Sequence, residues 1–262
     1  FDDFSDKDEI VNKDAVSMLT ILGVINGKED GSFFDPAGNV TRAEMAKMIA
    51  TVLNQGADVD GLYVGMNTGL TDVKGHWAES YINYCYSLGI IAGRGNGTFD
   101  PSATVTALEA AKMLLVALGY DAKVANYVGN DWAINVAADA VNAGIAPKGI
   151  VLADAMTREQ AAQMAFQTLT ADMVYYTNKG TTVNTPDGTQ VVVGASAPVK
   201  VANSKTDDYR TVSADRDEVQ QFCEKYFSDL TLNSNNHDDF GRPSDQWKNG
   251  TKEIGTYASP AD

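Results

Sequence analysis

The sequence predicts a mainly α-helical fold built from three helix–loop–helix units, and a repeated local motif is the basis of this prediction. A Thr, followed by Glu or Gln three residues later and then by an apolar run, occurs at Thr41, Thr106 and Thr157. This order is the capping box, in which the Thr side chain accepts a hydrogen bond from a first-turn N–H and the Glu or Gln reaches back to the N-cap. The apolar residues behind each box recur at helical spacing. Behind the first box they are Met45, Met48, Ile49, Val52 and Leu53.

Another helix and a turn-rich loop precede each box. The preceding helix starts near Asp14 in the first unit, near His76 in the second and near Asp131 in the third, where the loop is shorter. Because one unit cannot bury its apolar stripe alone, we expect the three units to pack together, with the boxed helices around a shared axis. We assign the units to residues 1–57, 58–123 and 124–176.

The sequence changes past residue 172 from helical stripes to β-branched runs. Residues 181–183 and 190–193 flank a Thr-Pro-Asp-Gly turn at 185–188, which predicts a hairpin. Further along we expect a short helix over 215–227, a loop over 233–236 and a last strand near 254–257. We assign residues 177–262 to a small β/α segment and interpret it as the start of an exported body.

Composition excludes several classes of partner. The formal net charge of −15 argues against nucleic acid and against anionic lipid surfaces. No stretch approaches the length of apolar sequence that spans a membrane, so we expect no membrane span. The sequence starts at Phe1 without Met, and we interpret it as a mature or trimmed chain, which leaves export open.

The sequence contains no arrangement that is typical of an enzyme. The two histidines, His76 and His237, are far apart, which argues against a zinc site or a catalytic triad. Cys85 and Cys223 lack the flanking His of a catalytic thiol, and we interpret both as structural, leaving open a bridge between them. We therefore expect no catalysis, no cofactor and no metal.

The series of motifs resembles the S-layer homology domain. It consists of F-x-D at Phe4–Asp6, L-G-I/V-I-x-G, G-x-F-D-P and T-R-A-E, and it covers roughly residues 1–176. The resemblance implies a pseudo-threefold trimeric prism around a central helical bundle, in a secreted protein of the bacterial cell wall or S-layer. It also implies that grooves between units bind a secondary cell-wall polymer, typically one carrying pyruvylated N-acetylmannosamine. Self-association in a surface layer is a further expectation.

Two arginines match the position that contacts the acidic ketal in that family. They are Arg42 and Arg158, and the second unit has Ala107 there instead, so we expect its groove to bind weakly or not at all. From the residues alone, an Arg beside the unpaired N–H groups of a helix N-terminus also makes a reasonable anion site, although a solvated surface Arg is the alternative. An acidic chain needs such locally placed cations to hold an anionic polymer.

Five further residues complete the expected ligand site. Lys28, Arg94 and Lys148 lie in corresponding loops after the first helix of each unit, and each could reach an acidic sugar. Trp77 and Trp132 match the family's Trp at the start of that helix. A Trp can stack on a sugar face, but core packing is the favoured interpretation for both.

Two functions follow from the resemblance. The first is a non-catalytic module that anchors a surface protein to the cell wall by binding its polymer. The second is the same anchor carrying an enzyme, such as a polysaccharide hydrolase, whose catalytic part lies beyond Asp262. Within these residues we prefer the first.

Overall fold

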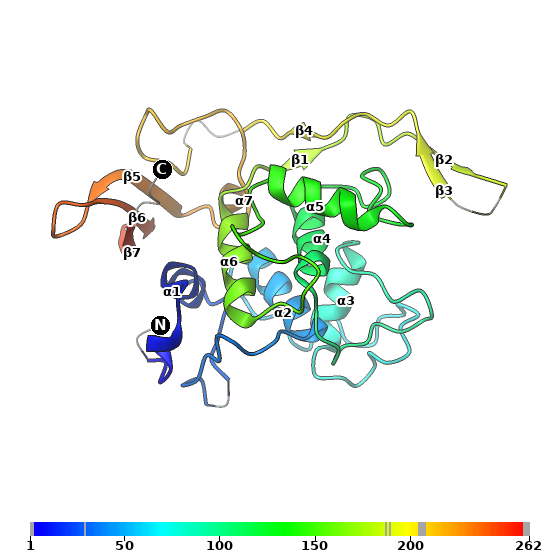
Figure 1. Ribbon diagram of the computed structural model, residues 1–262, viewed down its shortest axis with the longest axis horizontal. Helices are drawn as coiled ribbons and strands as arrows, with labels where there is room; N and C mark the ends of the chain where they lie inside the picture. Colours follow the sequence, from blue (N-terminus) through cyan, green and yellow to red (C-terminus); the bar gives the residue numbers. More distant parts are fainter. Residues whose placement is uncertain (1–2, 29, 187, 189, 204–207, 259–262) are drawn as a thin grey trace.

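The computed structural model describes residues 3–28, 30–186, 188, 190–203 and 208–258. Six α-helices gather in one body, which Figure 1 shows with the strands along one side and at the two ends. The helices are α1 (Lys13–Ile21), α2 (Arg42–Leu53), α3 (Glu79–Ser87), α4 (Ala107–Leu118), α5 (Trp132–Asn142) and α6 (Arg158–Leu169), with a short 3-10 helix at Lys7–Glu9. All three predicted capping boxes are present, with both side-chain hydrogen bonds formed, at the starts of α2, α4 and α6.

A closed ring of three hydrogen bonds joins the segments just before the boxed helices. The N–H of Val40 donates to the carbonyl of Met156, that of Met156 to Val105, and that of Val105 back to Val40, each over 2.9 Å. All three residues are buried. The helices α2, α4 and α6 therefore start from one shared ring, although they are far apart in the sequence.

The loop of the next unit pairs with the first N–H groups of each boxed helix. In α2 the N–H of Arg42 donates to the carbonyl of Ala103, and that of Ala43 to Pro101. The same two positions of α4 donate to Asp154 and Leu152, and those of α6 to Gly38 and Pro36. The third N–H is bonded to the Thr of the box. Neighbouring units thus complete one another's helix caps in a cycle.

Helix packing also crosses from unit to unit. Helix α2 packs against α3, α4 against α5, and α6 against α1, while α4 also contacts both α2 and α6. Leu114 and Met164 are buried and Met48 is half-buried against the same core. Cys85 and Cys223 are free thiols in this core. The apolar stripes therefore face one another, as their spacing predicts.

The strands follow residue 173 and form small antiparallel sheets. Strand β1 (Val174–Tyr175) pairs with β4 (Val199–Lys200), and β2 (Thr181–Asn184) pairs with β3 (Gln190–Val193). Strands β5 (Leu230–His237), β6 (Pro243–Asn249) and β7 (Lys252–Ala258) form a three-stranded meander. The predicted hairpin and last strand are thus confirmed, while position 187 of the turn lies outside the described residues.

Two expectations for this segment are wrong. Residues 233–236 belong to β5, where a bulge between Asn233 and Asn236 accommodates the polar run. The helix expected over 215–227 is reduced to α7 (Phe222–Tyr226). Upstream of it, Arg210 pairs with Asp208 and Asp217, and these local ion pairs hold residues 208–217 in a non-helical turn.

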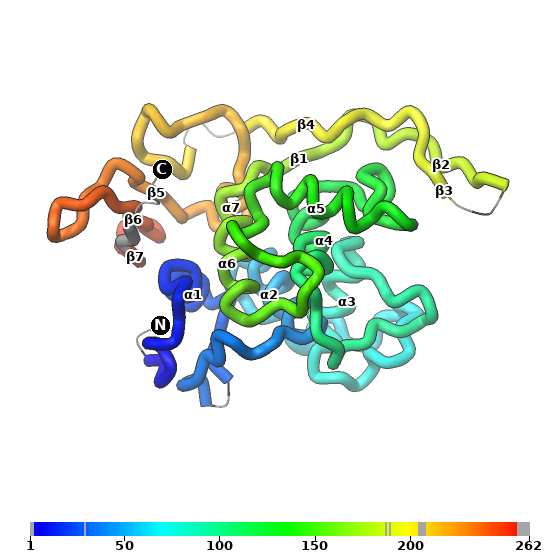
Figure 2. Tube along the Cα trace, viewed as in Figure 1, coloured from blue at the N-terminus to red at the C-terminus, as the bar shows by residue number. Residues whose placement is uncertain are grey.

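The helical and stranded parts share one hydrophobic core. Trp247 of β6 packs edge-on against Phe166 of α6, with ring centroids 6.3 Å apart. The N–H of Phe222 donates to the carbonyl of Ala171, and Figure 2 shows the last strands returning beside α1. A mainly α description therefore fits residues 1–176 but not the whole chain, which combines helices with small sheets.

Candidate ligand grooves

Arg42 is buried and holds the loop of the second unit. Only 4% of the residue is exposed. Its Nε donates to the carbonyl of Phe99 (2.8 Å), its Nη2 to that of Ala92 (3.3 Å), and its Nη1 to the Glu109 carboxylate (3.1 Å). The guanidinium lies over the Phe99 ring, 4.4 Å from the centroid. Burial and then repulsion from Arg94 lower the pKa of Arg42, and Glu109 counteracts this. These contacts and its burial give Arg42 a mainly structural role.

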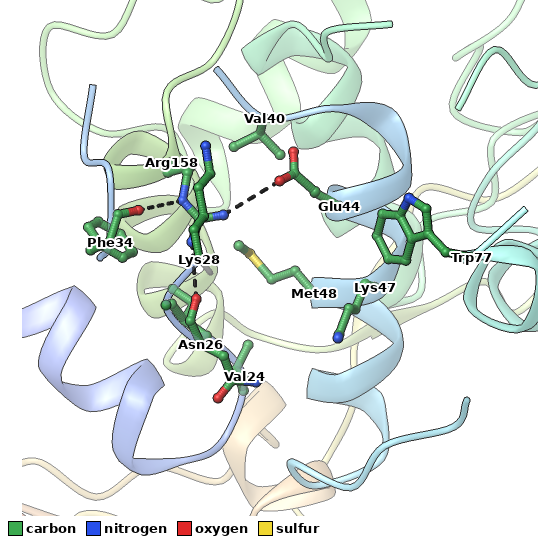
Figure 3. Close-up of a pocket in the computed structure, with 12 residues that line it drawn as sticks. Val24, Asn26, Lys28, Phe34, Val40, Glu44, Lys47, Met48, Trp77 and Arg158 are labelled. Carbon is green, nitrogen blue, oxygen red and sulfur yellow. Dashed lines mark hydrogen bonds and ion pairs between the residues drawn. The ribbon is translucent and has the colours of Figure 1, made fainter. Parts of the chain in front are cut away.

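Arg158 makes the equivalent contacts to the first unit. Its Nε donates to the carbonyl of Phe34 (2.7 Å) and its Nη2 to that of Asn26 (3.1 Å). Figure 3 shows these contacts together with Glu44, whose carboxylate lies 3.7 Å from Nη1. The guanidinium lies 5.2 Å from the Phe34 ring centroid. Its side chain is 12% exposed, so Arg158 is more open to a ligand than Arg42.

Asp6 of the F-x-D motif and Asp72, which ends the corresponding Leu-Thr-Asp of the second unit, position the loops that receive these arginines. The Asp6 carboxylate accepts from the N–H groups of Phe34 (2.9 Å) and of the next residue (2.7 Å). The Asp72 carboxylate does the same for Phe99 (2.8 Å) and the residue after it (2.7 Å). Each Asp thereby fixes the carbonyl to which the Arg of another unit donates.

The hypothesis that a free helix N-terminus binds the anion is wrong for α2, α4 and α6. Their first three N–H groups donate to loop carbonyls of the next unit and to the Thr of the box. These donors are unavailable to a ligand, so any anion has to be held by side chains.

A cavity of about 620 Å³, the first groove, lies where three units meet. Figure 3 shows its lining residues: Val24, Ile25, Asn26, Gly27, Lys28, Phe34, Val40, Glu44, Lys47, Met48, Trp77 and Arg158. Lys28 pairs with Asp35 at 2.5 Å. Trp77 is 53% exposed, which corrects the expectation of core packing for this residue. The groove thus combines three cations with an accessible aromatic face.

A cavity of about 430 Å³, the second groove, repeats this arrangement one unit further on. Arg42, Arg94, Lys112 and Trp132 occupy the positions of Arg158, Lys28, Lys47 and Trp77. Arg94 donates to Glu109 over 2.7 Å, so two arginines share one carboxylate. Trp132 is half-buried and packs against the core, closer to the expected role.

Sequence reasoning missed Lys47 and Lys112. The Nζ of Lys112 donates to the carbonyl of Tyr127 (2.7 Å) and lies 5.6 Å from the Trp132 ring centroid, and burial lowers the pKa of this lysine. The Nζ of Lys47 lies 5.3 Å from the Tyr81 ring centroid. A signal was present, because both lysines follow the Glu of the box by three residues, whereas the third box has Gln163 there.

The third equivalent position lacks the Arg and the helix Lys of the other two and keeps only the loop cation, Lys148. Backbone pairing aligns Ala107 with Arg42 and Arg158, and Ile150 with the two stacking phenylalanines. Lys148 is exposed and lies outside both grooves. The Glu159 carboxylate, next to Arg158 in the sequence, accepts from the N–H groups of Val11 and Asn12 just before α1. Among the described residues, no cluster of three His, Cys, Asp or Glu could hold a metal ion.

Comparison with known proteins supports the family suggested by the motifs. Residues 3–46 and 69–111 match the S-layer homology domain. The S-layer protein sap of Bacillus anthracis is 32% identical over 111 residues, which are 42% of this chain and 13% of that protein. A cellulosome-anchoring protein of Acetivibrio thermocellus is 32% identical over 106 residues, 38% of this chain and 22% of that protein. An uncharacterized cell wall amidase of Bacillus anthracis is 30% identical over 161 residues, 55% of this chain and 28% of that protein.

The fold and these matches define the class of protein. Residues 3–46 and 69–111 carry S-layer homology domain sequence, which S-layer and cell surface proteins share, and this indicates a cell-wall-associated protein at the cell surface. Its alignment spans less than a third of the length of each of these three relatives. No helix among the described residues combines the length and apolar character needed to cross a membrane.

Proposed function

We propose that this chain anchors a surface protein to the cell wall by binding an anionic wall polysaccharide in the first and second grooves. The observation that carries the proposal is the repetition of one arrangement. Each groove brings together an Arg, a loop cation, a Lys and a Trp from three different units. The similarity to proteins named as an S-layer protein and a cellulosome-anchoring protein supports an anchoring role.

The three units form, in this proposal, a pseudo-threefold prism around α2, α4 and α6. Support comes from the closed hydrogen-bond ring and from caps that run from each unit to the next. The arrangement explains why the grooves are composite, because each contains an Arg from one unit and the loop of another. The third position, with Ala107 and Gln163, binds the polymer weakly or not at all.

The polymer in this proposal carries pyruvylated N-acetylmannosamine. The negative ketal lies beside the Lys and the loop cation, because the Nε and Nη2 groups of each Arg are already bonded to carbonyls. The Trp face covers the sugar ring. Glu44 and Glu109 accept from sugar hydroxyls. Since the whole chain has a net charge of −15, only this local concentration of cations attracts the anion.

The described residues act without catalysis in this proposal, and self-association in a surface layer is a further part of it. The second candidate is an anchor that carries an enzyme outside this sequence. The relative named as a cell wall amidase is the observation that favours it. Sequence beyond Asp262 with a paired catalytic acid and base would support this alternative.

Co-sedimentation with purified cell-wall sacculi tests the proposal. The wild type is expected to sediment with intact sacculi and to remain in solution after the non-peptidoglycan polymer is stripped. Lys47→Ala should weaken binding, because one charge-assisted contact is worth ~1.5–3 kcal/mol, about ten- to a hundredfold in affinity. Trp77→Ala should also weaken it, because the substitution removes the face that covers the sugar ring. Lys252→Ala, at an exposed site on β7, is the matched control. Equal sedimentation with stripped sacculi would refute the proposal.

A further inference from the structure

A third cavity continues from the second groove toward the β2–β3 hairpin. It has a volume of about 920 Å³ and lies between the segment around the start of α5 and the hairpin strands. Val128 and Gly129 line both this cavity and the second groove, so the two spaces adjoin. Figure 1 shows the hairpin extending beyond α5 at this end of the molecule. We call the third cavity the hairpin groove.

The hairpin groove differs from the second groove in its chemistry. Its polar lining consists largely of amides and hydroxyls, namely Asn126, Asn130, Asn135, Thr182, Thr185 and Gln190. Its two charged residues, Lys123 and Asp131, have opposite signs. Amide and hydroxyl groups both donate and accept hydrogen bonds, as the hydroxyl and acetamido groups of a sugar do. The lining therefore suits a neutral sugar better than an anion.

The side of the groove next to α5 is held in a defined conformation. Asn126 has a φ of 55°, in the left-handed region, and its carbonyl accepts from Nδ2 of Asn135 (3.1 Å). At the base of the hairpin, Lys179 pairs with Asp121 at 3.0 Å. The two walls are thus tied to the same loop between α4 and α5. A two-stranded hairpin on its own is only marginally stable in water, so a ligand between the walls would add contacts that it lacks.

We propose that the hairpin groove is a second sugar subsite, which takes the neutral residues that follow the anionic residue held in the second groove. This inference rests on the proposed function. The combined space suits it, because cavities of roughly 300–1,000 Å³ hold ligands larger than one sugar ring. The polymer then runs from Trp132 past Gly129 to Thr182 and Gln190, and the hairpin contributes to anchoring although it lies outside the repeated units.

The hairpin offers a matched pair of test variants. Thr182 lines the groove, whereas its neighbour Thr181 points to the opposite face of the two-stranded sheet. Both are exposed, so neither substitution by Ala should disturb the core. The test variant is Thr182→Ala combined with Gln190→Ala, and the control is Thr181→Ala.

Calorimetric titration of the full chain decides the question. The probes are pyruvylated N-acetylmannosamine alone and the same residue linked to one or two neutral N-acetylhexosamines. We expect the longer probes to bind the wild type about tenfold more tightly, the test variant to lose this gain, and Thr181→Ala to keep it. All three proteins should bind the single sugar equally. Equal affinity for short and long probes, or an unaffected test variant, would overturn this inference alone. Failure of the wild type to bind any probe would instead refute the proposed function.

Discussion

Replacing Arg42 by Ala is expected to cost stability before it affects any ligand. The substitution removes the donor to the carbonyl of Phe99, a residue that is fully buried, and leaves that acceptor without its partner. An unpaired buried acceptor costs ~1–3 kcal/mol. Loss of the guanidinium stacked on the Phe99 ring adds about 1–2 kcal/mol at a desolvated site. The carbonyl of Ala92 and the carboxylate of Glu109 contribute less, because the first reaches solvent and the second keeps Arg94.

The total is a loss of about 2–5 kcal/mol in the free energy of unfolding. Urea unfolding followed by circular dichroism measures it, with Arg94→Ala as the control. Arg94 is an exposed partner of the same carboxylate, and an exposed ion pair is worth only ~0–1 kcal/mol. If Arg42→Ala unfolded at the wild-type urea concentration while losing wall binding, Arg42 would be a ligand contact without a structural role, and this reasoning would be wrong.

Three further outcomes can be measured on the same protein. Gly119→Ala should destabilise by about 1–3 kcal/mol more than Gly144→Ala, because both glycines have positive φ but only at Gly119 would a Cβ lie 2.0 Å from the carbonyl of Val174. Burial and then Asp245 raise the pKa of Asp14, so the folded state binds more protons above pH ~4 and stability falls as pH rises there. Asp14→Asn should thus raise the melting temperature at pH 7 but not at pH 3. An equal change in melting temperature at both pH values would contradict this. A fragment of residues 1–176 should keep wall binding, about tenfold weaker because it lacks the hairpin groove, and should melt at a lower temperature because it lacks Trp247 against Phe166. Complete loss of binding in the folded fragment would assign the hairpin to the main site.

Local chemistry made much of the fold predictable. A capping box needs only residues three apart on one chain, so Thr41, Thr106 and Thr157 mark three helix starts reliably. The buried stripes follow from helical spacing. The hydrogen-bond partners of the helix N-termini could not be predicted, because the carbonyls that accept from them belong to loops more than forty residues away in sequence. For this reason the sequence suggested an open anion site where the structure has a completed cap.

Only part of the ligand site could be predicted, because its residues also come from segments that are far apart in sequence. Positions with a motif counterpart, such as Arg158 and Trp77, lie in the first groove, while Lys148 lies outside both grooves. Lys47 was overlooked because a Lys in the first turns of an amphipathic helix usually marks a solvated face. Only the adjacent loop and Trp77, which come from other units, make Lys47 part of a groove.

The third unit provides an internal comparison that separates the two roles of the motif Arg. Where α2 and α6 begin with Arg stacked on Phe, α4 begins with Ala107 and the corresponding loop position is Ile150. The hydrogen-bond ring and the backbone caps are nevertheless complete at α4. The Arg is therefore not required to start the helix or to close the ring. At the third position the Arg and the Phe are absent together, as expected if this pair holds the loop carbonyls that line a groove. The same position has Gln163 in place of the helix Lys. The Arg and the helix Lys are thus lost together while the ring and the caps are kept, which supports the proposal that these two cations serve a ligand rather than the fold.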